Sequence, residues 1–330
     1  MASTSSNPFN EDYLLHSDHY GQDMKDLVLP ALAEKRVRTT VKGFEDRPIA
    51  CYQFAAEKPK GTVMIVHGFT ENAYKFSEIT YSLLKSGYSV LAYDQRGHGL
   101  SWRKEGLPDT SLTHVDDFEE YVKDMEIVCG KLLKGMPEPH FVFAHSMGGA
   151  VTGLFLERHA DVFKKAVLCA PMIAPNRSGL PLVLAKAVCG VPTVLGKGMK
   201  RSFLSKPYSG PEDFATSCAA GRERFDWYDA VKQAHPEFQN NSPSYRWILE
   251  AVGVTKKLLA PGAPEKIACP VRLYTAETDF SVLPEPQEAF IRRVKQGKRV
   301  FVPGSKHEIY RSTDAVFFPW WHEILGFFSD

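Results

Sequence analysis

Short runs of consecutive apolar residues alternate with amphipathic stretches along most of this chain. Continuous hydrophobicity over four to six positions is typical of a strand buried on both faces, as in a parallel sheet. We predict such strands at 61–66, 89–93, 141–144, 166–169, 271–275 and 299–301. Between them, hydrophobic positions at helical spacing predict helices at 76–86, 115–133, 149–159 and 315–328.

Strand and helix in repetition predict an α/β fold with a mostly parallel, doubly wound sheet. Ahead of the first buried strand, residues 37–41 and 47–54 interleave apolar with polar positions. This alternation on either side of a turn at 43–46 predicts an antiparallel hairpin before the core.

The alternation stops between Met172 and about Pro243, where prolines, glycines and short helical pieces replace it. Because a core strand follows this stretch, we interpret it as an inserted helical cap and not as an independent domain. The predicted division is a first core part at 1–172, a cap at 173–243 and a second core part at 244–330.

Composition agrees with a globular enzyme and excludes some partners. Of 330 residues, 44% are hydrophobic and 24% charged, which is enough to bury a sizeable core. The net charge of +1 provides no general attraction for nucleic acid. No apolar run reaches the roughly 20 residues of a spanning helix. Any contact with a membrane would therefore be peripheral.

The six cysteines are far apart and include no C-x-x-C pair. This spacing argues against a zinc site or a disulfide framework, so we expect reduced, mostly buried thiols. The N-terminal residues show no secretory signal pattern. We expect a cytoplasmic protein, with peripheral contact at the inner face of the membrane left open.

The most informative segment runs from a buried strand into a turn of small residues with a serine at its apex. It reads Ala-His-Ser-Met-Gly-Gly-Ala at 144–150. In a nucleophile elbow the serine occupies a strained strand-to-helix turn, and small neighbours let strand and helix approach. Ala144 stands where the usual motif has glycine. We predict Ser146 as a nucleophile; the alternative is a simple helix N-cap.

A serine nucleophile needs a base and a carboxylate, which follow it in the order acid, then histidine, in folds of this kind. The loop after the strand at 271–275 holds Glu277 and Asp279, and we favour Asp279 because it lies deeper in the loop. His307 follows the strand at 299–301 and is the predicted base. His145 is expected to point away from Ser146.

The oxyanion formed during acyl transfer needs two N–H donors. We predict the backbone N–H of Met147 as one donor. The other is expected in the loop after the first buried strand, where His67-Gly68-Phe69 forms a turn. Phe69 is the predicted donor there, and His67 is expected to brace the loop.

With these residues assembled, the chain resembles the α/β-hydrolase branch that holds bacterial lysophospholipase L2 and the monoacylglycerol lipases. The matching segments lie at 67–69, 93–101, 144–150, 154–159, 170–172, 242–247, 276–279 and 306–309. The Ala-His-Ser-Met-Gly-Gly elbow resembles the lysophospholipase L2 group, which makes Ala144 a mark of a subtype. The resemblance implies an α/β-hydrolase fold, the triad Ser146, Asp279 and His307, and an oxyanion hole at Phe69 and Met147.

We therefore expect a serine carboxyl-ester hydrolase acting on single-acyl lipids, either lysophospholipids or monoacylglycerols. It would need no metal or organic cofactor, and its partner would be a small-molecule acyl ester. One alternative is an aminopeptidase of the proline iminopeptidase type, which would hold a free amino terminus with acidic residues of the cap. Another is a non-enzymatic binder of small molecules. The oligomeric state is not predicted.

Two features of the cap bear on the substrate. The apolar stretch at 180–188 either packs over the sheet or faces an acyl chain or a lipid surface. Arginines of the cap could meet a head-group phosphate, or could be ordinary surface charges. These arginines are Arg201, Arg222, Arg224 and Arg246.

Overall fold

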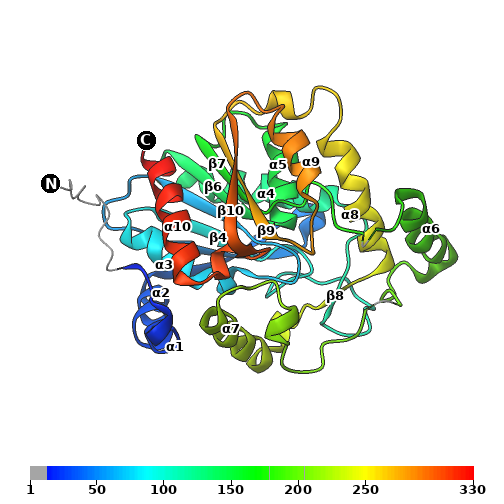
Figure 1. The fold of residues 1–330 in the computed structure, drawn as a ribbon, viewed down its shortest axis with the longest axis horizontal. Helices are drawn as coiled ribbons and strands as arrows, with labels where there is room; N and C mark the ends of the chain where they lie inside the picture. Colours follow the sequence, from blue (N-terminus) through cyan, green and yellow to red (C-terminus); the bar gives the residue numbers. More distant parts are fainter. Residues whose placement is uncertain (1–12, 178, 204) are drawn as a thin grey trace.

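A computed structural model describes residues 13–177, 179–203 and 205–330 of the chain. The N-terminal residues in which we expected no signal lie outside this part. The centre of the molecule is an eight-stranded sheet in the order β1-β2-β4-β3-β6-β7-β9-β10 (Figure 1). The strands are β1 (Arg36–Lys42), β2 (Pro48–Phe54), β3 (Thr62–Val66), β4 (Ser89–Tyr93), β6 (His140–His145), β7 (Lys165–Cys169), β9 (Val271–Thr278) and β10 (Gly297–Lys306).

Strand β2 runs antiparallel to both of its neighbours, and every other pair in this sheet is parallel. The predicted hairpin is confirmed as β1 and β2, with Val41 opposite Ile49. Each predicted buried strand is present. The sheet is therefore the mostly parallel one that the apolar runs indicated.

Helices cover both faces of the sheet. They are α1 (Tyr20–Asp23), α2 (Leu29–Lys35), α3 (Ser77–Lys85), α4 (Glu119–Lys131), α5 (Met147–Leu156), α6 (Leu182–Pro192), α7 (Arg222–Ala234), α8 (Tyr245–Leu258), α9 (Pro284–Ile291) and α10 (Asp314–Ser329). One core cluster joins the sheet to α4, α5, α8 and α9, and the other joins it to α2, α3 and α10. The predicted helices correspond to α3, α4, α5 and α10.

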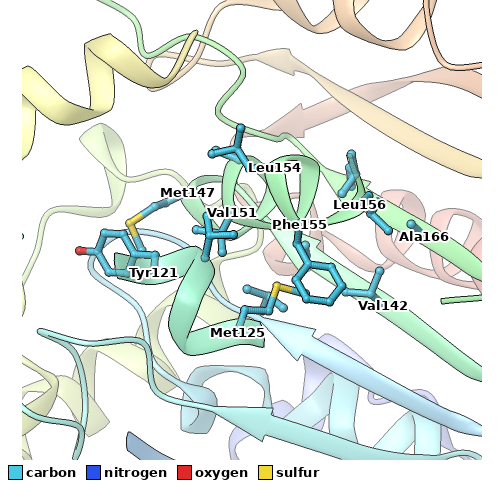
Figure 2. Close-up of a cluster of buried hydrophobic side chains, with 14 of the residues drawn as sticks. Tyr121, Met125, Val142, Met147, Val151, Leu154, Phe155, Leu156 and Ala166 are labelled. Atoms are coloured by element: carbon cyan, nitrogen blue, oxygen red, sulfur yellow. The ribbon is translucent and has the colours of Figure 1, made fainter. Parts of the chain in front are cut away.

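Helices α4 and α5 pack side by side on one face of the sheet (Figure 2). Tyr121 and Met125 lie one helical turn apart on α4, and Val151 and Phe155 do so on α5. These four side chains and Val142 of β6 are each at most 1% exposed. Burying a large apolar side chain contributes about 1.5–3 kcal/mol, so this cluster fixes the helix that follows the predicted nucleophile.

Between the end of β7 and the start of β9 the chain leaves the large sheet. It forms α6, α7, α8 and the short strand β8 (Ser242–Pro243). Strand β8 pairs in parallel with β5 (Leu112–Thr113), which lies earlier in the chain, between β4 and α4. Helix α8 packs against α5 and contributes Trp247 and Val254 to the core. Helix α6 lies at the outer end of this region (Figure 1). The division at 172 and 243 stays a prediction.

Candidate active site

Ser146 forms the turn between β6 and α5. Its φ of 51° and ψ of −117° lie in a backbone region that residues with a side chain rarely adopt. The backbone N–H of Ser146 donates to the carbonyl of Cys169 at 3.0 Å, and the carbonyl of Ser146 accepts from the N–H of Met172 at 2.9 Å. The strained turn is therefore braced by β7 and the residues that follow it.

Two glycines allow the elbow to form. A Cβ atom at Gly148 would lie 2.3 Å from the carbonyl oxygen of Val66. A Cβ atom at Gly149 would lie 2.5 Å from Cβ of Pro171. Real Cβ atoms do not approach other atoms so closely, so the first turn of α5 fits against the loops after β3 and β7 only when it carries no side chain there.

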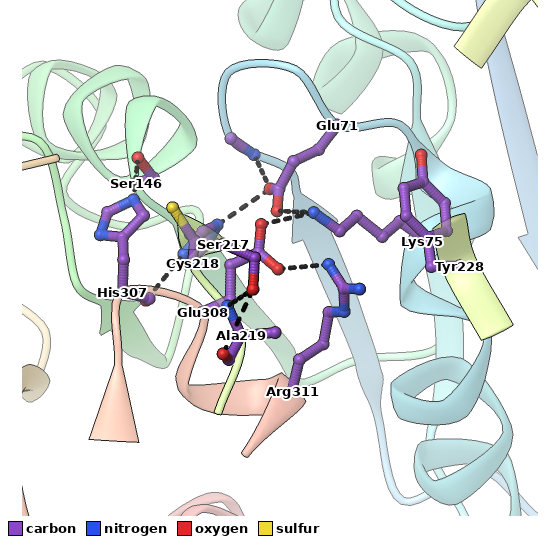
Figure 3. A network of polar contacts seen from close by, with 12 residues as sticks. Glu71, Lys75, Ser146, Ser217, Cys218, Ala219, Tyr228, His307, Glu308 and Arg311 are labelled. Atoms are coloured by element: carbon purple, nitrogen blue, oxygen red, sulfur yellow. Dashed lines mark hydrogen bonds and ion pairs between the residues drawn. The ribbon is translucent and has the colours of Figure 1, made fainter. Parts of the chain in front are cut away.

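The structure brings Asp279 and His307 to Ser146. Thr278 and Lys306 face each other in the register of β9 and β10. The residues that follow them are Asp279 and His307, which therefore leave the sheet side by side. Asp279 Oδ2 lies 2.7 Å from His307 Nδ1. On the other side of the ring, His307 Nε2 lies 2.9 Å from Ser146 Oγ (Figure 3).

The surroundings of Asp279 keep it ionised. Burial alone would raise the pKa of Asp279, but His307 and two backbone N–H donors outweigh burial and lower it. The donors are the N–H groups of Ser281 and Val282, at 2.8 and 3.0 Å from Oδ1. An ionised acceptor at Nδ1 of His307 fixes the proton there, which leaves Nε2 free to accept the proton of Ser146.

Glu277, the carboxylate that we considered less favourable, is not brought to the site. Its Oε2 accepts from the backbone N–H of Gly304 at 2.8 Å, on the exposed side of the sheet edge. His67 braces the neighbouring loop as expected, because its Nε2 accepts from the backbone N–H of Gln95 at 2.9 Å.

The two predicted oxyanion donors come from elements that meet at Ser146. As the first residue of α5, Met147 has an N–H without a partner inside the helix, at the positive end of the helix dipole. The loop after β3 carries Phe69. A Cβ atom at the preceding Gly68 would lie 3.0 Å from Cβ of Ser146, so this loop lies directly against the serine.

Sequence reasoning missed a buried charged network next to the triad (Figure 3). Glu71 Oε2 accepts from the backbone N–H of Gly68 at 2.5 Å and lies 2.9 Å from His145 Nδ1. Lys75 Nζ lies 3.2 Å from the other oxygen of Glu71. A possible signal was a glutamate and a lysine one helical turn apart directly after the oxyanion loop, but the same spacing is common on surfaces.

Within residues 13–177, 179–203 and 205–330, no three His, Cys, Asp or Glu side chains converge in the manner of metal ligands. All six cysteines are free thiols. Five are buried, and Cys218 is partly exposed, which confirms the prediction of mostly buried thiols.

Comparison with known proteins places this site in a wider group. The family described as serine aminopeptidase, S33, matches residues 57–314. The chain is 28% identical over 305 residues to lysophospholipase L2 of Escherichia coli strain K12, covering 87% of this chain and 86% of that protein. It is 30% identical over 119 residues to monoglyceride lipase of Rattus norvegicus, covering 36% of this chain and 37% of the relative.

Among solved structures, the fold is similar to a soluble variant of monoglyceride lipase from Saccharomyces cerevisiae in complex with a substrate analog. The TM-score is 0.70 at 19% identity, and the match covers 89% of this chain and 96% of that chain. This likeness confirms the predicted fold class.

Proposed function

Since the chain belongs to the serine aminopeptidase S33 family of α/β-hydrolases and is a carboxylic ester hydrolase, we propose that it cleaves lipids that carry a single acyl chain. Lysophospholipids and monoacylglycerols are such lipids. The observation that supports this proposal most strongly is the hydrogen-bonded series Asp279, His307 and Ser146 at the carboxyl edge of the sheet. Similarity to lysophospholipase L2 over 87% of the chain supports the substrate class.

In the proposed reaction, Ser146 Oγ attacks the ester carbonyl while His307 Nε2 takes its proton. Asp279 stabilises the imidazolium, and the N–H groups of Phe69 and Met147 bind the oxyanion. His307 then gives the proton to the leaving alcohol, and an acyl-enzyme on Ser146 remains. A water molecule, deprotonated by His307, releases the fatty acid. These steps require no metal and no organic cofactor.

The outer face of the cap supports peripheral contact with lipid. On α6 only Ala185 and Cys189 are buried. Val183 is 77% exposed and Val194, two residues beyond the helix, is 87% exposed. An apolar helix face left in water gains free energy by entering the interface of a bilayer. We call these exposed apolar residues of 182–195 the cap face and propose that it touches the lipid that presents the substrate. No described helix has the length and apolar character needed to cross a bilayer.

The cap arginines are already engaged by protein carboxylates. The ion pairs are Arg201 with Asp109 at 2.9 Å, Arg222 with Asp226 at 2.7 Å, Arg224 with Glu78 at 2.8 Å and Arg246 with Glu250 at 3.1 Å. Arg224 is in addition fully buried. Because their charges are compensated within the protein, we place recognition of the substrate on its acyl chain and not on these arginines.

The aminopeptidase alternative is less well supported. It needs unpaired acidic residues in the cap to hold a free amino terminus. Glu212 instead pairs with Lys232, and Asp229 accepts from the backbone N–H of Glu212 at 2.9 Å. Asp213 accepts from the N–H of Ala215, at the start of a short helix. These carboxylates are occupied by structural contacts.

One experiment separates the three candidate functions. The purified full chain is offered acyl esters of graded length, lysophosphatidylcholine, monoacylglycerol and a prolyl amide, and is labelled with a fluorophosphonate probe. We expect fatty acid release from the single-acyl lipids and labelling that is lost in Ser146→Ala. Cleavage of the prolyl amide alone would favour the aminopeptidase. A folded protein that neither cleaves nor labels would be a binder.

The role of Asp279 has a matched control in the same loop. Asp279→Asn places the amide where His307 needs an acceptor, and by analogy with other triads it lowers kcat by about 10⁴-fold. Glu277→Gln removes a carboxylate two residues away that accepts from the backbone N–H of Gly304, and we expect kcat to stay unchanged. Equal losses in the two variants would overturn the assignment of Asp279.

A further inference from the structure

His145, the residue before the nucleophile, is enclosed by hydrogen-bond acceptors. It is 1% exposed. Its ring points away from Ser146, with Nδ1 2.9 Å from Glu71 Oε2 and Nε2 3.2 Å from the backbone carbonyl oxygen of His307. A carbonyl oxygen has no proton to give. Nε2 must therefore carry a proton in order to bond His307.

The second partner, Glu71, is an acceptor as well. Its two oxygens receive the N–H of Gly68 at 2.5 Å, the hydroxyl of Tyr310, and the ammonium of Lys75 at 3.2 Å. Burial alone would raise the pKa of Glu71, but His145 and Lys75 outweigh burial and hold it well below the usual value. Glu71 is thus a carboxylate, and Nδ1 of His145 must be protonated too.

With both nitrogens protonated, His145 is an imidazolium cation. Burial alone would lower the pKa of His145, but Glu71 and Glu308 outweigh burial and raise it. Lys75 acts in the opposite direction. The titratable and charged groups around His145 lie on several segments that pack against it. They are Glu71, Lys75, His67, Cys169, His307, Glu308 and Tyr310.

We propose that the buried pair of Glu71 and His145 is a positioning device that ties the oxyanion loop to the backbone of the catalytic base. One oxygen of Glu71 holds both the N–H of Gly68 and the ring of His145. The far nitrogen of the same ring holds the carbonyl of His307. The hydrogen bonds that join Gly68, Glu71, His145 and His307 thereby fix the distance between the Phe69 donor and His307. The inference rests on the proposed function, because that distance matters only if both groups act on an ester.

The device has a pH dependence of definite sign. An imidazolium with a raised pKa is stable below that pKa and loses its proton as the pH rises through it. One of its nitrogens then faces an acceptor without a proton, and the link is broken. We expect the kcat of the wild type to fall on the alkaline side. Glu71→Gln removes the charge that raises the pKa of His145, so this fall should move to lower pH.

Two measurements on the full chain test the proposal. In the wild type, ¹⁵N spectra of histidine-labelled protein at neutral pH should show both His145 ring nitrogens protonated, with the signals assigned from their loss in His145→Gln. Glu71→Gln should show one nitrogen deprotonated. Because displaced catalytic groups cost up to about 10²-fold, we expect kcat of Glu71→Gln to fall by about tenfold to a hundredfold with KM unchanged.

Asp124 provides a matched control, because its side chain bonds Phe44 and Arg96 and neither Gly68 nor His145. It is buried, its Oδ1 accepts from the backbone N–H of Phe44 at 2.8 Å, and its Oδ2 pairs with Arg96 at 2.6 Å. Like Glu71 it holds a backbone N–H and a buried cation, but that cation is Arg96 and not His145. Asp124→Asn should lower stability and leave kcat and its pH profile unchanged.

A neutral His145 in the active wild type would overturn the proposal, as would a Glu71→Gln enzyme with the kcat and pH profile of the wild type. Should Glu71→Gln not fold, the spectrum of the wild type still decides. Tyr310→Phe then gives the kinetic test, because it removes one donor to Glu71 and should shift the alkaline fall slightly. A wild type that cleaves no ester would overturn the proposed function. The ¹⁵N spectrum would still show whether His145 is charged beside Glu71.

Discussion

Helices α5 and α6 are both short and built mainly from apolar residues, yet they lie in opposite environments. Every residue of Met147–Leu156 is buried, whereas α6 buries only Ala185 and Cys189. Helix α5 lies against the sheet, with α4 and α8 beside it, while the contacts of α6 are with α8 and with the residues that directly follow α6. Apolar content alone therefore does not decide whether a helix is buried. What decides it is whether the helix packs against the sheet.

The difference also separates two tasks. The fixed helix holds the strained turn of Ser146, because a serine at φ 51° persists only where the surrounding structure over-determines it. The exposed helix holds no such turn, and its apolar surface is available to something outside the chain. On our proposal, the reaction takes place at the packed edge of the sheet, and the outer cap contacts the lipid.

The largest expected effect is a contrast between two variants, each of which removes one hydroxyl next to one of these helices. Ser146→Ala at the start of α5 should lower ester turnover by about a thousandfold or more, because the proposed acyl-enzyme forms on its hydroxyl. Thr193→Ala at the end of α6 removes only a hydroxyl bonded to the carbonyl of Cys189 at 2.7 Å, and turnover should not change. Turnover of a soluble ester measures both. Substantial activity in Ser146→Ala would contradict the proposed chemistry.

Adding a methyl group to a glycine should act in opposite directions in the two helices. In α5, Gly148→Ala puts Cβ 2.3 Å from the carbonyl of Val66 and should cost about 1–3 kcal/mol of unfolding free energy. In α6, Gly190→Ala meets nothing within 4 Å and should stabilise by about 0.5–1 kcal/mol, because alanine favours helix. Denaturant unfolding measures both. A stabilised Gly148→Ala protein would show that the elbow is looser than described.

The cap face gives the next effect. Replacing Val183 and Val194 by aspartate should weaken binding to phosphatidylcholine vesicles by about tenfold or more, since each buried valine contributes roughly 1.5 kcal/mol. Hydrolysis of a soluble ester should be unchanged. Val37→Asp is the control, because Val37 is 59% exposed but lies on β1, outside the cap. Equal losses in the two proteins would mean that the cap face is not the lipid contact.

The sequence allowed the sheet and the triad to be predicted because both depend on local patterns. A strand buried on both faces leaves a continuous apolar run, and loops after parallel strands meet at one edge. Asp279 and His307 could be found for this reason, although 28 residues separate them. The apolar stretch at 180–188 left two options open, and the structure decides against packing over the sheet.

Other elements left no such pattern. Helices α1 and α2 were not predicted, because α1 has four residues and α2 buries only Leu32. Helices this short depend on tertiary packing and not on local propensity. The network around Glu71 was also missed. Its members Lys75, His145 and Glu308 come from separate elements, and only the folded chain brings them together.

The smallest expected effect lies at the other end of α5. Glu157 follows the last residue of the helix, and no group among the described residues bonds its Oε1. Burial raises the pKa of Glu157 to about 7. A folded-state pKa above the unfolded value means that stability is highest at acid pH and falls as the pH rises through about 7.

Glu157→Gln should therefore stabilise the protein at pH near 8 by about 1 kcal/mol, after allowance for solvent screening, and have no effect near pH 4. Denaturant midpoints at the two pH values measure this, with the exposed Glu265→Gln as a control that should gain nothing. A gain of equal size at both pH values would assign the effect to packing and not to the carboxylate charge.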